Sequence, residues 1–336
     1  MNRHTATRRR FVGISAAAGG LALLPPGAAA QRTAEGAAVT WRGVVLGAVG
    51  TIVVHHPDRI AAERLVARAL NEVRRLDGLF SLYREDSALV ALNRRGALEA
   101  PPADMVRLLA ACARYAELTG GAFDPTVQPL WRLYFEHFSR PGADPAGPPA
   151  AALSAALGRV GYGRILVGRD RIALGARGMQ VTLNGIAQGY ITDRIVELLR
   201  DGGIERTMVD LGEARVLGSR PDGRPWQVGL ADPDDPGRVR ETLGLVDRAV
   251  ATSGGYGMAF DPAGRFGHIL DPRTGASPRL HRSVSVVAPD ATTADALSTA
   301  FSLMPPPAID AALARLRGVA AHLVHADGSA GVRTAG

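Results

Sequence analysis

Two glycine-rich segments of the chain carry polar side chains that a hydrophobic core does not require. Residues 120–127 read Gly-Gly-Ala-Phe-Asp-Pro-Thr-Val, and residues 183–190 read Leu-Asn-Gly-Ile-Ala-Gln-Gly-Tyr. Glycines let a backbone approach a ligand closely, and free N–H groups at the start of a helix can bind an anion. Each segment is a candidate binding loop, and each could also be an ordinary turn.

Two further stretches carry groups that could do acid–base or metal chemistry. Residues 252–256 (Thr-Ser-Gly-Gly-Tyr) precede residues 268–275 (His-Ile-Leu-Asp-Pro-Arg-Thr-Gly), so several reactive side-chain types gather within a short span. Asp295 and Thr299 are four residues apart on a predicted helix and therefore share one face. Their oxygens could bind Mg²⁺, although an aspartate in a first helical turn can also simply interact with the helix dipole.

Hydrophobic periodicity predicts the elements that must position these segments. Residues 80–93 are rich in turn formers and residues 140–149 in Pro, Gly and Ala, so both stretches are predicted to be irregular. The order of elements mixes antiparallel-looking strands with helices and predicts an α+β fold. The predicted helices are 60–79, 102–118, 150–160, 190–199 and 294–303, and the predicted strands include 44–54, 208–211, 226–230, 243–246 and 284–287.

The N-terminus has the pattern of an export signal. Arginines at 8–10 precede an apolar run over 12–24, and the alanines at 28–30 provide an A-x-A cleavage site. The paired arginines resemble a twin-arginine signal. The alternative is a membrane anchor, but the run is far shorter than the roughly 20 residues that span a bilayer. We expect a signal peptide over 1–30, a linker over 31–43, one domain over 44–336 and a periplasmic location.

Composition excludes several classes of function. All 39 basic residues are arginine, so no lysine is present for a Schiff base or a P-loop. The formal net charge is +7, but residues 1–30 hold four arginines and no acid, which leaves 35 basic against 32 acidic residues elsewhere. This small, dispersed charge does not predict nucleic-acid binding. Cys112 lies in an apolar helical pattern and is predicted to be a buried core residue.

Taken together, these segments resemble the FAD:protein FMN transferases, the ApbE family. The resemblance covers about residues 44–304 and rests on six motifs that occur in the family's order. They are Phe80-Ser81-x-Tyr83 with Asp86-Ser87 and Leu92-Asn93; 121–127 with Pro129-Leu130; 185–190 with Asp193; 252–254 with Tyr256; 268–275; and 294–300. No single motif is specific, but six in order do not arise by chance.

The resemblance implies a role for each member of a small set of residues. His268 would lie against the flavin or its pyrophosphate, and the carbonyl of Gly185 would bind Mg²⁺ together with Asp295 and Thr299. The implied fold is a T-fold-like α+β architecture, with mixed or antiparallel sheets and packed helices around an FAD groove. The FAD pocket would be lined by Tyr83, Ala122, Phe123, Asp124, Thr182, Gln188 and Ile269.

The implied reaction attaches the FMN half of FAD to another protein. A Thr or Ser hydroxyl of a client flavoprotein would attack the phosphorus on the FMN side and AMP would leave, while Mg²⁺ would offset the charge of the phosphates. The hydroxyl needs a base, for which His268 and Asp295 are both candidates. The client would be a periplasmic or membrane-bound redox protein, so any association with the inner membrane would be peripheral, and the transferase would be a monomer or a homodimer.

Three positions depart from the commonest family pattern. Gln188 stands where many members have lysine, which removes a charge but keeps a hydrogen-bonding group. Thr182 stands where many have aspartate. Residues 211–214, Leu-Gly-Glu-Ala, replace a more usual Leu-Gly-Gly-Asp, so Glu213 alters the backbone approach there. We expect FAD binding to survive these changes and the rate of transfer to be the more sensitive property.

Other functions remain open on the sequence alone. One is a non-catalytic periplasmic FAD carrier or assembly factor for a respiratory enzyme, and another is a pyrophosphatase that releases AMP and FMN to water. An oxidoreductase is weaker, because the chain has no Rossmann-type dinucleotide fingerprint. The fate of FMN separates the transferase, the carrier and the pyrophosphatase, because FMN ends up bound to a protein, retained in FAD or free.

Overall fold

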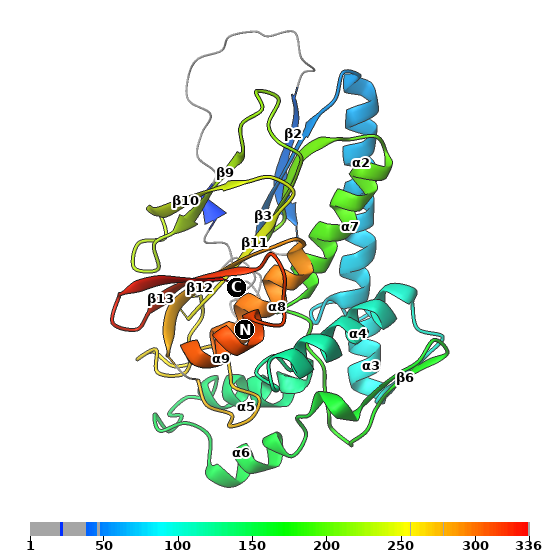
Figure 1. The fold of residues 1–336 in the computed structure, drawn as a ribbon. Helices are drawn as coiled ribbons and strands as arrows, with labels where there is room; N and C mark the ends of the chain where they lie inside the picture. The colour runs from blue at the N-terminus through cyan, green and yellow to red at the C-terminus, as the bar shows by residue number, and fades with distance from the viewer. Residues whose placement is uncertain (1–20, 23–37, 46–47, 256, 278, 335–336) are drawn as a thin grey trace, which may run out of the picture. The chain divides into compact units, whose positions relative to one another are not determined.

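The computed structural model describes residues 21–22, 38–45, 48–255, 257–277 and 279–334 (Figure 1). The chain divides into two compact units. The first unit comprises the chain up to Arg74, Gln188–Thr252 and Ser285–Asp295, and the second comprises Arg75–Ala187, Ser253–Val284 and the chain from Ala296 onward. Several elements, among them α2 (Arg59–Phe80) and α8 (Ala291–Phe301), run from one unit into the other.

The strands and helices alternate irregularly along the chain. In order they are β1 (Leu21–Ala22), β2 (Ala38–Val45), β3 (Ala48–His55), α2 (Arg59–Phe80), α3 (Ala88–Arg95), β4 (Ala97–Glu99), α4 (Ala103–Leu118), η2 (Pro125–Val127), α5 (Gln128–Phe138), α6 (Ala150–Leu157), η3 (Tyr162–Arg164), β5 (Ile165–Val167), β6 (Arg171–Leu174), α7 (Ala187–Asp201), β7 (Arg206–Asp210), β8 (Ala214–Leu217), β9 (Trp226–Ala231), β10 (Val239–Leu245), β11 (Ala249–Gly254), β12 (His281–Ala288), α8 (Ala291–Phe301), α9 (Pro306–Leu313), β13 (Ala320–His325) and β14 (Ala330–Thr334).

The first unit is built on an antiparallel sheet. Its strands follow the order β2-β3-β7-β8-β11, and each neighbouring pair is antiparallel. Buried and half-buried residues alternate along β8, as expected of a strand with one covered face. The end of α7 meets α2, since a Cβ on Gly202 would lie 2.5 Å from a methyl carbon of Leu65 (Figure 1).

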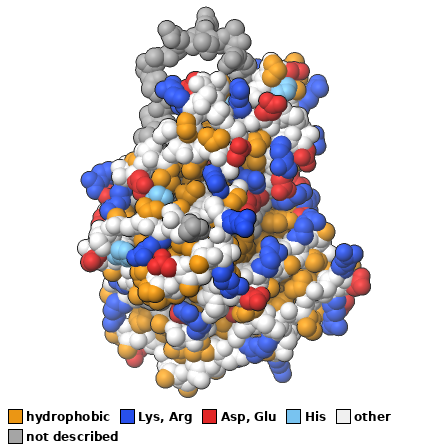
Figure 2. All heavy atoms as spheres, viewed as in Figure 1, with side chains coloured by type: hydrophobic (Ala, Val, Ile, Leu, Met, Phe, Trp, Pro, Cys, Tyr) orange, Lys and Arg blue, Asp and Glu red, His pale blue; other side chains and the backbone are white. Residues whose placement is uncertain are grey.

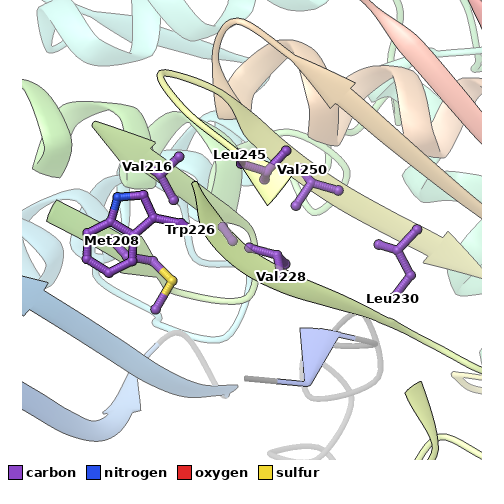
Figure 3. Packing of buried hydrophobic residues seen from close by; sticks show 8 residues of the cluster. Met208, Val216, Trp226, Val228, Leu230, Leu245 and Val250 are labelled. Atoms are coloured by element: carbon purple, nitrogen blue, oxygen red, sulfur yellow. The ribbon is translucent and has the colours of Figure 1, made fainter. Parts of the chain in front are cut away.

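A cluster of buried apolar side chains joins this sheet to a smaller one. β9 pairs antiparallel with both β1 and β10. Trp226 of β9 packs with Met208 of β7 and Val250 of β11 (Figure 3). Burial of each large apolar side chain contributes about 1.5–3 kcal/mol, so these contacts hold the two sheets together. The cluster is completed by Ala214, Val216, Val228, Leu230 and Leu245.

The second unit is mainly helical. The buried face of α4 repeats every three or four residues, and Cys112 is fully buried on it, as predicted. A small antiparallel sheet has the order β4-β6-β5. Leu130 and Tyr134 of α5 pack with Leu270, and the hydroxyl of Tyr134 donates to the carbonyl of Gly275 at 2.8 Å. The helical core therefore anchors both ends of residues 270–275.

The predicted α+β class with antiparallel sheets is confirmed, but two local predictions are wrong. Two paired strands, β2 and β3, replace the single strand predicted over 44–54, and β2 begins within the stretch expected to be a linker. The turn-rich stretch 80–93 contains α3, because Ser87 accepts a hydrogen bond from the N–H of Val90 as an N-cap and Gly96, with φ 75°, ends the helix. The polar residues that suggested a turn are helix caps. The predicted signal peptide lies outside the described residues except for Leu21 and Ala22.

The visible surface carries charges of both signs. Arginine and acidic side chains are interspersed on the face drawn in Figure 2, with hydrophobic atoms between them. Many arginines pair locally, as Arg59 does with Glu63 at 2.8 Å and Arg132 with Glu136 at 3.0 Å. In the part of the chain that the structure describes, no helix is both long and apolar enough to cross a bilayer.

Two histidines meet in the second unit. His281 Nε2 lies 2.9 Å from the carbonyl oxygen of Met304, and His281 Nδ1 lies 3.1 Å from His325 Nδ1. A carbonyl oxygen only accepts, so the proton of neutral His281 is on Nε2 and His325 donates to its Nδ1. Burial lowers the pKa of His281; the carbonyl of Met304 raises that pKa, and His325 lowers it further.

We expect the free energy of unfolding to fall as the pH drops below about 6.5, because the unfolded chain then binds a proton that folded His281 excludes. Replacement of His281 by Gln should make this fall shallower. Urea unfolding of both proteins at pH 8 and pH 5 measures the difference, and parallel pH dependences would contradict the assignment.

Candidate functional site

Residues 181–185 form a segment of the second unit that two other predicted motifs hold in place. Asn93 Nδ2 donates to the carbonyl of Val181 at 2.8 Å, and Asn93 Oδ1 accepts from the N–H of Val181 at 2.7 Å. The N–H of Thr182 donates to the carbonyl of Pro125 at 2.7 Å. The loop around Pro125 and the start of the second glycine-rich segment therefore lie side by side.

The carboxylate of Asp124 joins its own loop to the backbone at Tyr162. Oδ1 accepts from the N–H and the hydroxyl of Thr126 at 2.7 and 2.6 Å, and Oδ2 accepts from the N–H of Tyr162 at 2.9 Å. Burial raises the pKa of Asp124, and these hydrogen bonds lower it. Asp124 thus shapes the loop that carries Ala122 and Phe123, both of which are buried.

The hydroxyl of Thr299 lies against Gly185. A Cβ on Gly185 would lie 2.9 Å from Thr299 Oγ1, so a larger residue would displace the hydroxyl. Ser253 Oγ lies 2.9 Å from Ser298 Oγ and 3.4 Å from Thr299 Oγ1. Three of the predicted motifs therefore meet within the second unit, at residues 185, 253 and 299.

His268 is half-buried and oriented by a single carbonyl. The carbonyl oxygen of Met258 lies 3.0 Å from both the backbone nitrogen and Nδ1 of His268. Because that oxygen only accepts, Nδ1 carries the proton of the neutral ring and Nε2 keeps a lone pair. Burial lowers the pKa of His268. The ring is therefore neutral at pH 7 and can accept a proton at Nε2.

Tyr83 is exposed, and Ile269 is half-buried. Half of the surface of Tyr83 is exposed, and burial of the remainder raises the pKa of its phenol while a hydrogen bond with the side chain of Asn184 lowers it. The N–H of Asn184 donates to Thr182 Oγ1 at 3.3 Å. Asn184 was not singled out from the sequence, although it precedes Gly185 in the glycine-rich segment. Tyr256 lies outside the described residues.

Gln188 belongs to the first unit and lies against the Leu-Gly-Glu-Ala turn. Its Nε2 donates to the carbonyl of Leu211 at 3.4 Å. Gly212 has φ 109°, and a Cβ there would lie 2.5 Å from the same nitrogen. The backbone conformation favours glycine, and a Cβ there would also displace the amide of Gln188.

Asp295 is buried at a crossing of α7 and α8. Its Oδ2 accepts from the N–H of Gly189 at 3.0 Å. A Cβ on Gly189 would lie 2.2 Å from the carbonyl oxygen of Ala291 and 2.8 Å from Cβ of Asp295, so only glycine allows the crossing. Burial raises the pKa of Asp295 to about 7, the Gly189 N–H lowers it and Asp193 raises it. A carboxyl in this setting binds a proton or a cation readily.

The first turn of α8 is fixed by Asp193. The N–H groups of Ala291 and Thr292 donate to its two oxygens at 2.8 Å each, and Arg215 Nη1 lies 2.7 Å from Oδ1. This cap sets the start of the helix that carries Asp295 and, one turn later, Thr299. From the sequence, Asp193 belongs to the motif at 185–190 but has no predicted role.

The oxygen donors of the predicted metal site fit a hard cation. Within the described ranges, no three His, Cys, Asp or Glu side chains are grouped as metal ligands. The predicted ligands are a carbonyl, a hydroxyl and one carboxylate, which suits Mg²⁺ because this ion keeps several waters and needs only one or two carboxylates. Gly185 and Thr299 meet in the second unit, and Asp295 is one helical turn from Thr299 on α8.

Gly189→Ala is expected to lower the free energy of unfolding by about 1–3 kcal/mol, because the added methyl group meets backbone rather than a flexible side chain. Gly163→Ala is the matched control, since a Cβ there meets nothing within 4 Å, and its effect should stay within about 0.5 kcal/mol. Urea unfolding measures both, and equal losses would contradict the close crossing.

The chain is similar to known proteins over most of its length. The ApbE family model matches residues 46–323. An FAD:protein FMN transferase of Klebsiella pneumoniae is 30% identical over 297 residues, which cover 85% of this chain and 84% of the relative. One from Treponema pallidum is 34% identical over 286 residues, 76% of each chain.

Solved structures show the same fold. The flavin transferase ApbE of Vibrio cholerae superposes with a TM-score of 0.77 at 27% identity, covering 89% of this chain and 97% of that one. The ApbE protein of Thermotoga maritima gives a TM-score of 0.78 at 31% identity, again over 89% and 97% of the two chains.

Proposed function

Because this chain belongs to the ApbE family, we propose that it transfers the FMN half of FAD to a Thr or Ser hydroxyl of a client flavoprotein and releases AMP with the help of Mg²⁺. Membership of the ApbE family makes the chain a flavin transferase, and a protein receives its FMN. The cation, the leaving group and the acceptor residue are the parts of the proposal that need testing.

One observation carries the cation site. The Thr299 hydroxyl lies against Gly185, and Asp295 occupies the preceding turn of the same helix. The Gly185 carbonyl, Thr299 hydroxyl and Asp295 carboxylate would hold Mg²⁺, which supplies charge neutralisation at the phosphates when bound. Ser253, at 3.4 Å from Thr299 Oγ1, orients that hydroxyl.

His268 is the better candidate for the base. Its Nε2 keeps a lone pair on a neutral ring, whereas Asp295 accepts from Gly189 and is needed as a ligand. In the proposed step Nε2 takes the proton of the client hydroxyl as its oxygen bonds to the phosphorus on the FMN side. The bond between that phosphorus and the oxygen of AMP breaks, and AMP leaves with the electron pair.

The FAD-binding residues would be drawn from loops rather than from a dinucleotide fold. Ala122, Phe123 and Asp124 lie on a loop that its own hydrogen bonds make rigid, Thr182 is joined to that loop, and Tyr83 bonds with Asn184. Ile269 would contact the flavin beside His268. Gln188 would offer an amide where a cation is usual, with its position fixed by Leu211.

The location of the client is a further part of the proposal. The N-terminal arginine pair and apolar run support export to the periplasm, and the client would be a periplasmic or membrane-bound redox protein. Membrane contact would then come through the client, and the transferase would act as a monomer or homodimer.

Transfer is tested by intact mass. The chain from Gln31 onward, mixed with FAD, Mg²⁺ and a candidate periplasmic flavoprotein domain, should add one FMN to the client, and EDTA should abolish the gain. Thr299→Val should slow transfer by about 10-fold or more through loss of a ligand, and Ser302→Ala, just beyond the same helix, should not. Free FMN without client labelling would indicate a pyrophosphatase, and retained FAD without labelling a carrier.

His268→Gln is expected to slow transfer by about 10²–10⁴-fold, because it removes the proton acceptor. FAD affinity, followed by flavin fluorescence, should change little, since the glutamine can still donate to the Met258 carbonyl. A variant that transfers FMN at the wild-type rate would remove His268 from the role of base.

A further inference from the structure

Strand β9 has a partner on each edge, and one partner comes from the N-terminal end of the described chain. In the antiparallel pairing of β1 with β9, Leu21 lies opposite Leu230 and Ala22 lies opposite Gly229. The other edge of β9 pairs with β10 over its full length. β1 is the short blue arrow beside these two strands in Figure 1. β9 is therefore the central strand of a three-stranded sheet in the first unit.

The sequence of β9 is that of a strand paired on both edges. Its six residues, Trp-Gln-Val-Gly-Leu-Ala, include no charge and no proline, and residues 228–231 are all buried. Strands that stay at an edge usually carry charges, prolines or bulges, which discourage pairing with other chains. β10 has such features, because Arg240 and Glu241 are exposed and the register shifts between Val239 and Glu241. β10 is thus built as a permanent edge, whereas β9 without β1 would be an unprotected one.

The residues that pair with this edge belong to the proposed export signal. Leu21 and Ala22 fall within the apolar run 12–24 and precede the A-x-A site at 28–30. A ladder of two residues is weak by itself. Residues 23–37 connect β1 to β2, and a short tether keeps two partners at an effective concentration of about millimolar. The pairing therefore depends on the signal segment being part of the same chain.

We propose that the free edge of β9 is a docking site for the chain's own signal segment, which adds residues 21–22 to the sheet as an antiparallel strand. Strand addition relies on main-chain hydrogen bonds and needs only an extended peptide. The folded domain and the export machinery then compete for the same residues, so export of the folded precursor requires β1 to leave β9. The inference rests on the proposed location only for the identity of the segment, because the pairing involves neither FAD, Mg²⁺ nor a client.

The test is amide hydrogen exchange of the purified full chain and of the chain from Gln31 onward. Peptides that span Gly229 and Leu230 should exchange about 10-fold or more slowly in the full chain, because only there can β1 pair with β9. Leu21→Pro combined with Ala22→Pro removes both N–H groups of β1, so this variant should exchange as fast as the shorter chain.

Val12→Pro combined with Gly13→Pro, in the same part of the N-terminus, is the matched control and should keep the slow exchange. Should a full-chain variant fail to fold, a synthetic peptide of residues 12–30 added to the shorter chain should slow exchange in β9, and the peptide with prolines at 21–22 should not. Equal exchange of β9 in the full and shorter chains would overturn the proposal. So would protection of β9 in the shorter chain that grows with protein concentration, because a second copy would then occupy the edge. Neither outcome bears on FMN transfer, which the mass of the client measures separately.

Discussion

The cap that Asp193 places on α8 is the interaction on which the site depends. One carboxylate joins two N–H groups of the first turn of α8 to Arg215 of β8, so helix and sheet share a single anchor. A carboxylate at a helix N-terminus also offsets the positive end of the helix dipole. Asp295 lies one turn after residues 291–292, so this anchor positions the carboxylate of Asp295 within the first unit. Loss of one partner of such a buried pair typically costs about 3–5 kcal/mol.

Two glycines also position the residues of the site. Gly189 lets α7 approach α8 until its N–H reaches Asp295, and Gly212 lets the turn after β7 approach Gln188. Close approach excludes water, which strengthens each remaining charge interaction and makes unpaired carboxylates unfavourable. Buried acids of this kind lower the stability of the first unit unless they bind a proton or another partner, a compromise common at functional sites.

Most elements could be predicted because their side-chain periodicity is local. The apolar spacing of α2, α4 and α7 is legible in the sequence, and those helices lie where they were predicted. The helix α3 was missed because Ser87 and Gly96 read equally well as turn residues and as caps. Burial of the intervening leucines favours a capped helix over a turn, and both Leu89 and Leu92 are fully buried. The roles of the predicted site residues remain predictions.

The sequence by itself determined the kinds of chemical groups available, their order along the chain and the family to which they belong. Only the tertiary structure decided which of those groups are already engaged. The carboxylate oxygens of Asp124 accept hydrogen bonds from Thr126 and Tyr162, whereas Oε2 of Glu213 has no hydrogen bond within the described residues. The reason is that hydrogen bonding and desolvation come from neighbours distant in the chain, as with Gly189 and Asp295, which are 106 residues apart.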